Sequence, residues 1–305
     1  MGSGNIEKLW DKKVIENIEK ITWPKMMRTA SIWNYYLYSG FVKLGIKINR
    51  SMKDWDIPDK VRGVMPIDIF WKTMPPQRIW YDFQDFPRQY YEKTVKGNDV
   101  YFKIMLHKDS THYDRIYPIG QTAATAQVSL FEKLPKREKD IDVIGMFRNT
   151  DQGIRKAAVA IVKGQRWRSF VGMAQFRNRQ PLPKNIQQRK VGYAEHLILQ
   201  NRSKICLDFP GVGGEWSWRW TEILGMGGFC LRIAPHHACP GNPRNCWAEV
   251  KRNLSDLVEK IDYYLANDEA RNEIAKNGKE YYETYLSPAA QARYVLNIAM
   301  ERRDD

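Results

Sequence analysis

The sequence has little of what stabilises small secreted proteins or anchors membrane proteins. Its 305 residues contain four cysteines, too few for a disulfide scaffold. No apolar run reaches the ~20 residues that a membrane-spanning helix needs, and the polar start of the chain shows no secretory signal. We therefore expect a cytoplasmic protein without a transmembrane segment. Peripheral contact with a membrane surface stays open.

Acidic residues are also few in comparison with basic ones. The chain has 49 Lys and Arg against 35 Asp and Glu, which gives a formal net charge of +14. Such an excess attracts polyanions, for example nucleic acid, anionic lipid or phosphorylated glycan. Because the basic residues are scattered, solubility alone is the competing interpretation.

The few cysteines fall into two groups. Cys206 and Cys230 lie within apolar strand patterns and are expected to be small core residues. The other two share a Pro- and Gly-rich loop with a histidine pair: His236, His237, Cys239 and Cys246. Their spacing fits none of the common zinc patterns, so a zinc site, a disulfide and a plain loop all stay open.

The sequence contains enough hydrophobic residues to form the cores of two α/β domains. Hydrophobic residues make up 43% of the chain, and 305 residues fit two cores better than one. Helical spacing predicts helices over 5–21 and 31–44, and short apolar runs predict strands at 79–81 and 100–106. Alternating strands and helices indicate an α/β fold. The charged segment 132–140 is the best candidate for a domain boundary.

The most informative segment runs from Lys204 to Ile233. It predicts a buried strand, a glycine loop, a helix and a second strand. Such a unit directs a helix N-terminus and backbone N–H groups toward an anion. Ser217 and Arg219 lie where this helix begins, so a phosphate-bearing ligand fits the pattern.

Other side chains could join that site. Arg148 follows a predicted strand and Arg155 lies one turn into the next helix, so both could face the same edge of a parallel sheet. Guanidinium groups offer planar, paired donors to phosphate. One of the three tryptophans around Ser217 could stack on a base or a sugar, and at least one should be in the core.

In the first half of the chain, two carboxylates follow a predicted strand. Asp82 and Asp85 could each act as general base on an acceptor hydroxyl. The alternative for an Asp in this position is a helix N-cap.

These segments together resemble the CAP10-type glycosyltransferases, which include protein O-glucosyltransferases, capsule xylosyltransferases and lipopolysaccharide-modifying enzymes. The likeness covers roughly residues 78 to 300. It rests on four segments in order: WYDFQDFP at 80–87, FRNTDQGIR at 147–155, KICLDFPGVGGEWSWRW at 204–220, and 247–278. Two departures are a donor loop two residues longer around Gly213 and Gly214, and Gln84 in place of an arginine.

The resemblance implies a role for particular residues. Asp85 would be the catalytic base, with Asp82 in reserve. The implied donor-binding residues are Arg148, Thr150, Arg155, Gly211, Val212, Gly213, Gly214, Ser217, Trp218, Arg219 and Glu222.

The resemblance also implies a GT-B fold, in which two Rossmann-like domains face a cleft. We expect an acceptor-side domain over 1–138, a nucleotide-sugar domain over 139–285, and a C-terminal helix over 286–305 that crosses back to the first domain. The implied reaction is transfer of glucose or xylose from a UDP-sugar to a hydroxyl, with inversion. Arginines and helix N–H groups would stabilise the leaving diphosphate, so neither a metal nor a cofactor is expected.

The acceptor is expected to be anionic, a phosphorylated glycan or glycolipid, with DNA second. This expectation rests on the net charge and on an arginine-rich stretch expected beside the cleft, which contains Arg166, Arg168, Arg177, Arg179 and Arg189. Two alternatives stay open: a glycosyltransferase that acts on modified bases in DNA, and a non-catalytic basic protein that binds nucleic acid.

Overall fold

A computed structural model of the chain divides into two compact units. The first comprises residues 1–125, 237–242 and 284–305, and the second comprises 126–236 and 243–283. The residues that the structure describes are 12–24, 31–50, 63–84, 95–110, 114–120, 125–149, 153–175, 181–211, 216–241 and 243–302.

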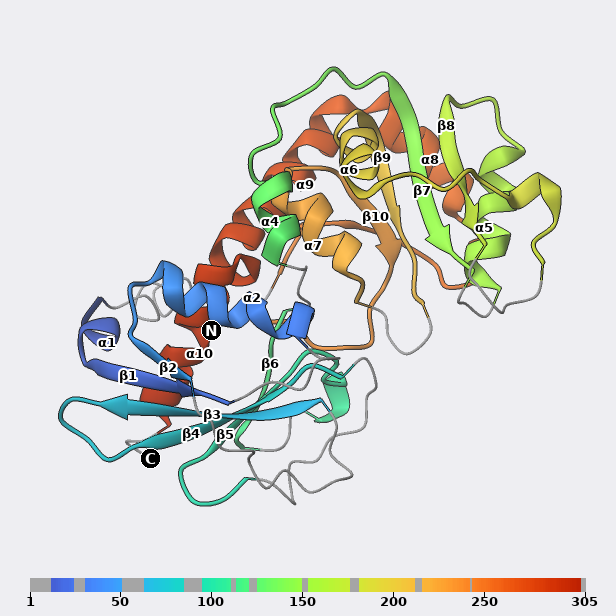
Figure 1. Cartoon of the computed structure of the whole chain (residues 1–305). Coiled ribbons are helices and arrows are strands. Elements are labelled where there is room, and N and C mark those ends of the chain that lie inside the picture. Colours follow the sequence, from blue (N-terminus) through green and yellow to red (C-terminus); the bar gives the residue numbers. More distant parts are fainter. Residues whose placement is uncertain are drawn as a thin grey trace. The chain divides into compact units, whose positions relative to one another are not determined.

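The first unit contains a six-stranded mixed sheet in the order β2-β1-β3-β4-β5-β6 (Figure 1). Its strands are β1 (Ile18–Trp23), β2 (Ile48–Arg50), β3 (Val64–Trp71), β4 (Gln77–Asp82), β5 (Val100–Lys103) and β6 (Ile116–Pro118). β3 runs antiparallel to both neighbours, whereas β4, β5 and β6 are parallel to one another. This sheet therefore departs from an all-parallel Rossmann sheet at β3.

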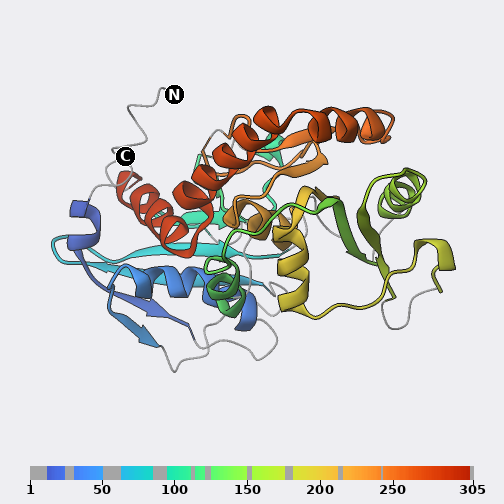
Figure 2. The ribbon, with the colours of Figure 1, turned by 90° about the horizontal axis from the view of Figure 1, so that it is seen from above.

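The helices of this unit come from both ends of the chain. They are α1 (Lys12–Glu16), α2 (Ser31–Lys43), the 3-10 turn η3 (Lys108–Ser110) and α10 (Pro288–Glu301). α10 packs against α2, and Figure 2 shows it in red. Ser287 caps α10 by accepting from the Ala290 N–H, and Pro288 occupies its first position, where no N–H is needed. The Tyr36 hydroxyl donates to the Leu286 carbonyl at 2.6 Å, which fixes where α10 begins.

The second unit is a parallel five-stranded sheet in the order β11-β10-β9-β7-β8. Its strands are β7 (Ile141–Arg148), β8 (Ser169–Ala174), β9 (Ser203–Asp208), β10 (Cys230–Ile233) and β11 (Ala248–Val250). The chain moves outward from β7 to β8 and then returns past β7 to β9. The direction of winding therefore reverses between β7 and β9, and ligands of such sheets bind at the carboxyl ends of the strands at this point.

Helices cover both faces of this sheet. They are α4 (Thr125–Phe131), α5 (Ile154–Lys163), η4 (Lys184–Ile186), α6 (Tyr193–Asn201), α7 (Trp218–Gly225), α8 (Leu257–Ala266) and α9 (Asp268–Tyr281). The π-helical η5 (Tyr282–Leu286) follows α9, where the chain passes from the second unit to the first. α5 packs with α8, while α6 packs with α7. Right-handed crossovers on either side of a reversal place helices on opposite faces, so β7 and β9 are covered twice and their apolar residues form the core.

Most predicted elements are present, and the α/β fold is confirmed in both units. The predicted helix over 5–21 is confirmed for 12–16 and wrong for 18–21, because 18–23 form strand β1; residues 5–11 lie outside the described residues. The charged segment 132–140 falls inside the second unit, directly before β7.

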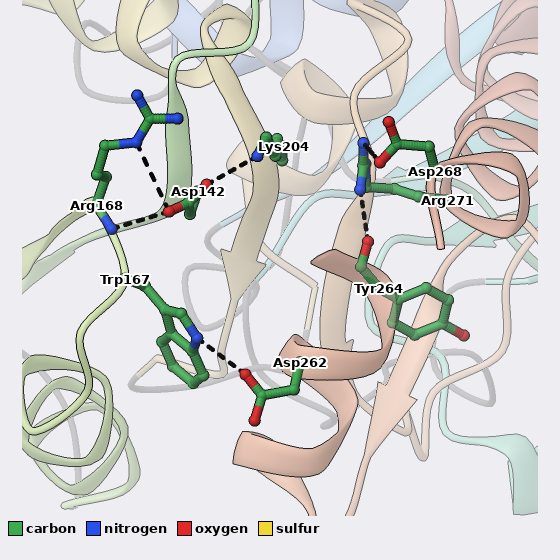
Figure 3. A network of polar contacts seen from close by, with 8 residues as sticks. All are labelled: Asp142, Trp167, Arg168, Lys204, Asp262, Tyr264, Asp268 and Arg271. Atoms are coloured by element: carbon green, nitrogen blue, oxygen red, sulfur yellow. Dashed lines mark hydrogen bonds and ion pairs between the residues drawn. The ribbon is translucent and has the colours of Figure 1, made fainter. Parts of the chain in front are cut away.

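Polar contacts fasten the amino ends of the second unit's strands (Figure 3). Asp142 on β7 accepts from Lys204 on β9 at 3.0 Å and from the Arg168 N–H at 2.9 Å. Trp167 donates to Asp262 on α8, and buried Arg271 binds the Tyr264 carbonyl and Asp268. These contacts lie at the edge of the sheet opposite to the reversal point, so they support the strands without entering the candidate site.

Candidate functional site

The candidate site lies at the carboxyl ends of β7 and β9. The last backbone pairing between these strands joins Ile144 to Cys206, whereas β7 stays paired with β8 as far as Arg148. The ends of β7 and β9 are thus no longer joined by the sheet itself. Side chains from α5 and α7 take over this task, and they are the residues for which the sequence predicted a phosphate site.

Arg155 joins the two strand ends. From the first turn of α5 it donates to the Phe209 carbonyl after β9 through Nε at 3.2 Å and Nη2 at 2.9 Å, and to the Arg148 carbonyl through Nη1 at 3.5 Å. Gly211 allows this approach, because a Cβ there would lie 2.9 Å from Nη2. Gly153 precedes α5 with φ of 109°, a conformation that favours glycine.

One buried carboxylate serves two buried arginines. Asp208, the last residue of β9, lies 3.2 Å from Arg219 Nη1 and 3.7 Å from Arg232 Nη2. It also accepts a hydrogen bond from the Ser217 hydroxyl. Ser217 is the N-cap residue of α7, yet its side chain makes no cap bond, because the hydroxyl is directed to Asp208. We call Asp208, Ser217, Arg219 and Arg232 the Asp208 cluster.

The Asp208 cluster places two buried arginines around one buried carboxylate. Arg219 is 8% exposed and Arg232 is 1% exposed. Within the described part of the chain, Arg219 Nε makes no hydrogen bond. A desolvated cation is costly unless an anion or hydrogen-bond acceptors compensate it. The cluster at the start of α7 is therefore arranged to receive an anion.

Three tryptophan rings lie close to the Arg232 guanidinium. Its guanidinium carbon lies 4.1, 5.4 and 5.7 Å from the rings of Trp216, Trp220 and Trp247. Trp216 and Trp220 are 4% and 1% exposed, so the expectation that at least one of these tryptophans is in the core is confirmed. Cation–π contacts of this kind compensate part of the desolvation of a buried arginine.

A second carboxyl group lies one turn further along α7. Glu222 accepts a hydrogen bond from the Tyr193 hydroxyl on α6 at 2.7 Å. Burial raises the pKa of Glu222 to about 7, against the opposing effects of the Tyr193 hydrogen bond and Arg219. Burial and the nearby Arg219 lower the pKa of His196, also on α6, to about 3, so this imidazole is neutral at physiological pH.

Trp218 and Arg148 form a separate, more exposed pair. Trp218 is the first residue of α7 and is half-buried, and Arg148 is exposed at the end of β7. The Arg148 guanidinium lies over the indole ring, 5.6 Å from its centroid. The pair connects the end of β7 with the start of α7.

The structure thus brings together the described part of the predicted donor site: Arg148, Arg155, Gly211, Ser217, Trp218, Arg219 and Glu222. Other predicted site residues lie outside the described residues, namely Asp85, Thr150, Val212, Gly213 and Gly214.

Asp82 is placed differently from what catalysis needs. It is fully buried at the end of β4 and pairs with the equally buried Lys103 at 2.9 Å. It also accepts from the Tyr101 hydroxyl and the Gln84 N–H. Burial raises its pKa, and Lys103 and the hydrogen bonds oppose that rise. This burial and these partners support a structural role for Asp82.

The arginine-rich stretch is not gathered at the carboxyl edge. Arg168 precedes β8 at the amino edge and contacts Asp142, and Arg189 pairs with Glu195. Arg177 and Arg179 lie outside the described residues. Arg168 and Arg189 therefore each have a carboxylate partner and do not together form the basic surface that we expected beside the site.

The Cys and His loop shows neither of the two special arrangements. All four cysteines are free thiols. His237 pairs with His107 in a short antiparallel bridge, with ring centroids 5.7 Å apart. Across the described ranges, no three His, Cys, Asp or Glu side chains converge as metal ligands would. The plain-loop interpretation is therefore the one that the structure supports.

A family model for glycosyl transferase-like proteins matches residues 121–297, which is more than half of the chain and includes the whole candidate site. The chain belongs to this glycosyl transferase-like family. Membership confirms the glycosyltransferase class that the motifs predict, while the narrower CAP10 type stays a prediction.

Individual proteins show weaker similarity to this family member. An uncharacterised protein of Invertebrate iridescent virus 6 is 38% identical over 55 residues, which cover 18% of this chain and 5% of the viral protein. A solved structure of a glycosyltransferase from Rickettsia africae ESF-5 matches with 14% identity and a TM-score of 0.46. The match covers 100% of this chain and 83% of the Rickettsia chain.

Two further solved structures match this chain over about half of their own length. One is a mutant of TarM from S. aureus in complex with fondaparinux, alpha-GlcNAc-glycerol and UDP. The match has 10% identity and a TM-score of 0.41, and it covers 66% of this chain and 44% of the TarM chain. The other is CalG4, the calicheamicin glycosyltransferase. The match has 14% identity and a TM-score of 0.38, and it covers 69% of this chain and 56% of the CalG4 chain. All these TM-scores are low, so the similarities assign no residue and no ligand to this chain.

Helix length and hydrophobicity give no candidate for a membrane span anywhere in the described ranges. This finding agrees with the lack of long apolar runs in the sequence.

Four residues of the site were not predicted from the sequence: Tyr193, His196, Asp208 and Arg232. Asp208 and Arg232 could have been found, because each is a charge inside an apolar strand pattern, LDF and CLRI. Such a residue is usually paired or functional. Tyr193 and His196 are three residues apart on α6, and nothing in their spacing distinguishes them from ordinary helix residues.

Proposed function

We propose that this chain transfers a sugar from a UDP-sugar to the hydroxyl of an acceptor. The observation that carries the proposal is buried Arg219, whose Nε makes no hydrogen bond within the described residues, at the start of a helix whose N-cap side chain makes no cap bond. A diphosphate would accept a hydrogen bond from this guanidinium. Arg219 and Arg155 would bind the donor, and a fixed positive field would stabilise the leaving diphosphate.

The choice of UDP, of glucose or xylose, and of inversion rests on the resemblance to CAP10-type enzymes. In this proposal Asp85 removes the proton from the acceptor hydroxyl. The reaction proceeds in one displacement without a metal ion. The acceptor is an anionic glycan or glycolipid, and a modified base in DNA is the second candidate.

Nucleotide binding tests the proposal directly. A thermal-shift series with UDP, GDP, ADP, their sugars and inorganic pyrophosphate should show the largest rise in Tm for UDP and UDP-sugars. A ligand at 100 times its Kd adds ~2.7 kcal/mol of stability. The absence of any shift with nucleoside diphosphates, combined with tight binding of DNA or RNA, would replace this proposal by the nucleic-acid-binding alternative.

Arg219 is the residue to vary. Arg219→Ala should weaken UDP binding by a factor of tens or more, since truncating one partner of a buried charge pair costs ~2–5 kcal/mol. Arg202→Ala is a matched control, because Arg202 pairs with Asp140 at the amino end of the sheet. Calorimetry should find UDP affinity unchanged in the control; equal affinities in both variants would disprove the role of Arg219.

A further inference from the structure

We infer that the Trp218 ring, covered in this structure by the Arg148 guanidinium, is the surface on which the nucleobase of the donor stacks. This inference rests on the proposed function. It assigns the base to a residue pair of its own, separate from the Asp208 cluster that would hold the phosphates.

The three tryptophans of the WSWRW segment are not equivalent. Trp216 and Trp220 point into the core and pack on each other with centroids 4.3 Å apart, and both lie over Arg232. Trp218 lies between them in sequence but is half-buried instead of fully buried. An aromatic residue that retains exposed surface beside a candidate ligand site is available to a planar ligand.

The position of Trp218 suits the base of a nucleotide bound at α7. It is the residue next to Arg219 and directly follows Ser217, so it starts the same helix that would receive the phosphates. Arg148 reaches it from the end of β7, the strand on the other side of the reversal point. A ligand with its phosphates at the start of α7 therefore has an aromatic ring within the same turn of helix.

The Arg148 guanidinium on the Trp218 ring indicates what kind of ligand this ring can bind. A guanidinium over an indole face is held by cation–π attraction and by stacking of two planar groups. A nucleobase is also planar and binds the same face, with sequence-tolerant stacking. The base takes the place of the guanidinium on the ring, and Arg148, exposed and on a long side chain, moves aside.

The test compares UMP with ribose 5-phosphate, two probes that share the phosphate and the sugar and differ by the base. In the wild-type chain UMP should bind about tenfold more tightly or better, and it should quench tryptophan fluorescence while ribose 5-phosphate does not. Trp218→Leu should abolish the difference between the probes by weakening UMP only. Trp218→Phe should keep most of it, and Trp167→Phe, at the amino edge, should change neither probe.

The outcomes separate this inference from the proposed function. If Trp218→Leu binds both probes as the wild type does, the base does not stack on Trp218, and the phosphate site stands. If neither probe nor UDP binds to the wild type, both the proposed function and this inference are wrong. If Trp218→Leu does not fold, the wild-type comparison decides: equal affinities for UMP and ribose 5-phosphate overturn the inference.

Discussion

At the scale of single residues, Asp208 determines how the buried arginines are stabilised. Its Oδ1 accepts hydrogen bonds from the Ser217 hydroxyl and from Arg219 Nη1 at the start of α7, while its Oδ2 lies 3.7 Å from Arg232 Nη2 on β10. Because Arg219 and Arg232 share this carboxylate, its removal would take an ion-pair partner from two buried cations at once.

Asp208→Asn should therefore destabilise the chain strongly. Breaking a buried ion pair by removing one partner costs ~3–5 kcal/mol, and urea unfolding would measure it. Asp140→Asn is the control, because solvent screens the exposed pair of Asp140 with Arg202 and its loss should cost little stability. UDP should restore more stability to Asp208→Asn than to the wild type, since the anion then compensates both arginines. Equal losses in the two variants would contradict this account.

Glu222 should make stability depend on pH. Its pKa in the folded chain is about 7 against an ordinary 4.5, so the folded chain binds the proton more tightly. Stability therefore falls as the pH rises from about 4.5 to about 7, by ~3 kcal/mol in total. His196, with its pKa lowered from 6.5 to about 3, contributes the opposite slope between those two values.

Comparison of the wild type with Glu222→Gln isolates the first effect, because both retain His196. The variant should gain stability relative to the wild type between pH 5 and pH 8, measured by urea unfolding at each pH. Glu195→Gln, on the exposed side of α6, should show no such gain. A constant difference between wild type and Glu222→Gln across this range would show that Glu222 ionises normally.

At the scale of elements, the strands β7 and β9 are held together at both ends. Asp142 and Lys204 join their amino ends, and Arg155 joins the carbonyl groups beyond their carboxyl ends. The sheet can therefore be open at the reversal point without the strands separating. A ligand bound there would find backbone groups whose positions are already fixed, which reduces the entropy lost on binding.

Gly211→Ala tests this bridge. The new Cβ would lie 2.9 Å from Arg155 Nη2, so Arg155 must move and weaken its bonds to the Phe209 carbonyl. We expect a loss of about 1–3 kcal/mol of stability, the typical range for hydrogen bonds to a charged group, and weaker UDP binding. Gly192→Ala, where a Cβ meets nothing within 4 Å, should stay within ~0.5 kcal/mol of the wild type. Equal behaviour of the two variants would argue against the bridge.

The elements of the second unit were predictable from the sequence because their signals are local. Segment 204–233 shows apolar runs and a helical spacing, and these correspond to the observed β9, α7 and β10. In the first unit the signals are weaker. Residues 18–23 continue a helical spacing, yet pairing with β2 and β3 makes them a strand. Such long-range pairing overrides local propensity and cannot be seen in the spacing.

The sequence was enough to predict which charged residues lie in the site, but not which of them pair with one another. Arg148, Arg155 and Arg219 could be located because they follow strands or begin helices. The choice of Arg219 and Arg232 as joint partners of Asp208 depends on the side-by-side register of β9 and β10, where Asp208 faces Arg232. Sequence spacing does not reveal which strands are neighbours, so this pairing could not be derived.

At the scale of the whole molecule, the net charge of +14 predicts how the acceptor is attracted. Exposed charges act over ~8–10 Å at ordinary ionic strength and are screened by salt. Raising NaCl from about 50 to about 500 mM should raise the apparent KM for an anionic acceptor and leave kcat nearly unchanged. The KM for the donor should change less, because the Asp208 cluster is buried.

A neutral analogue of the acceptor is the control for the salt experiment. Its KM should be insensitive to salt. If the anionic acceptor behaves in the same way, or if the neutral analogue is used equally well, the basic surface serves only solubility.

The tryptophan packing around Arg232 also gives the second unit an optical signature. Trp216 and Trp220 are held 4.3 Å apart at an interplanar angle of 39°, so their indole transitions interact as a fixed, chiral pair. A strong near-ultraviolet circular dichroism band should come from this pair and vanish when side-chain packing melts, even while backbone helicity persists. Loss of that band on heating or in urea would report the unfolding of the second unit.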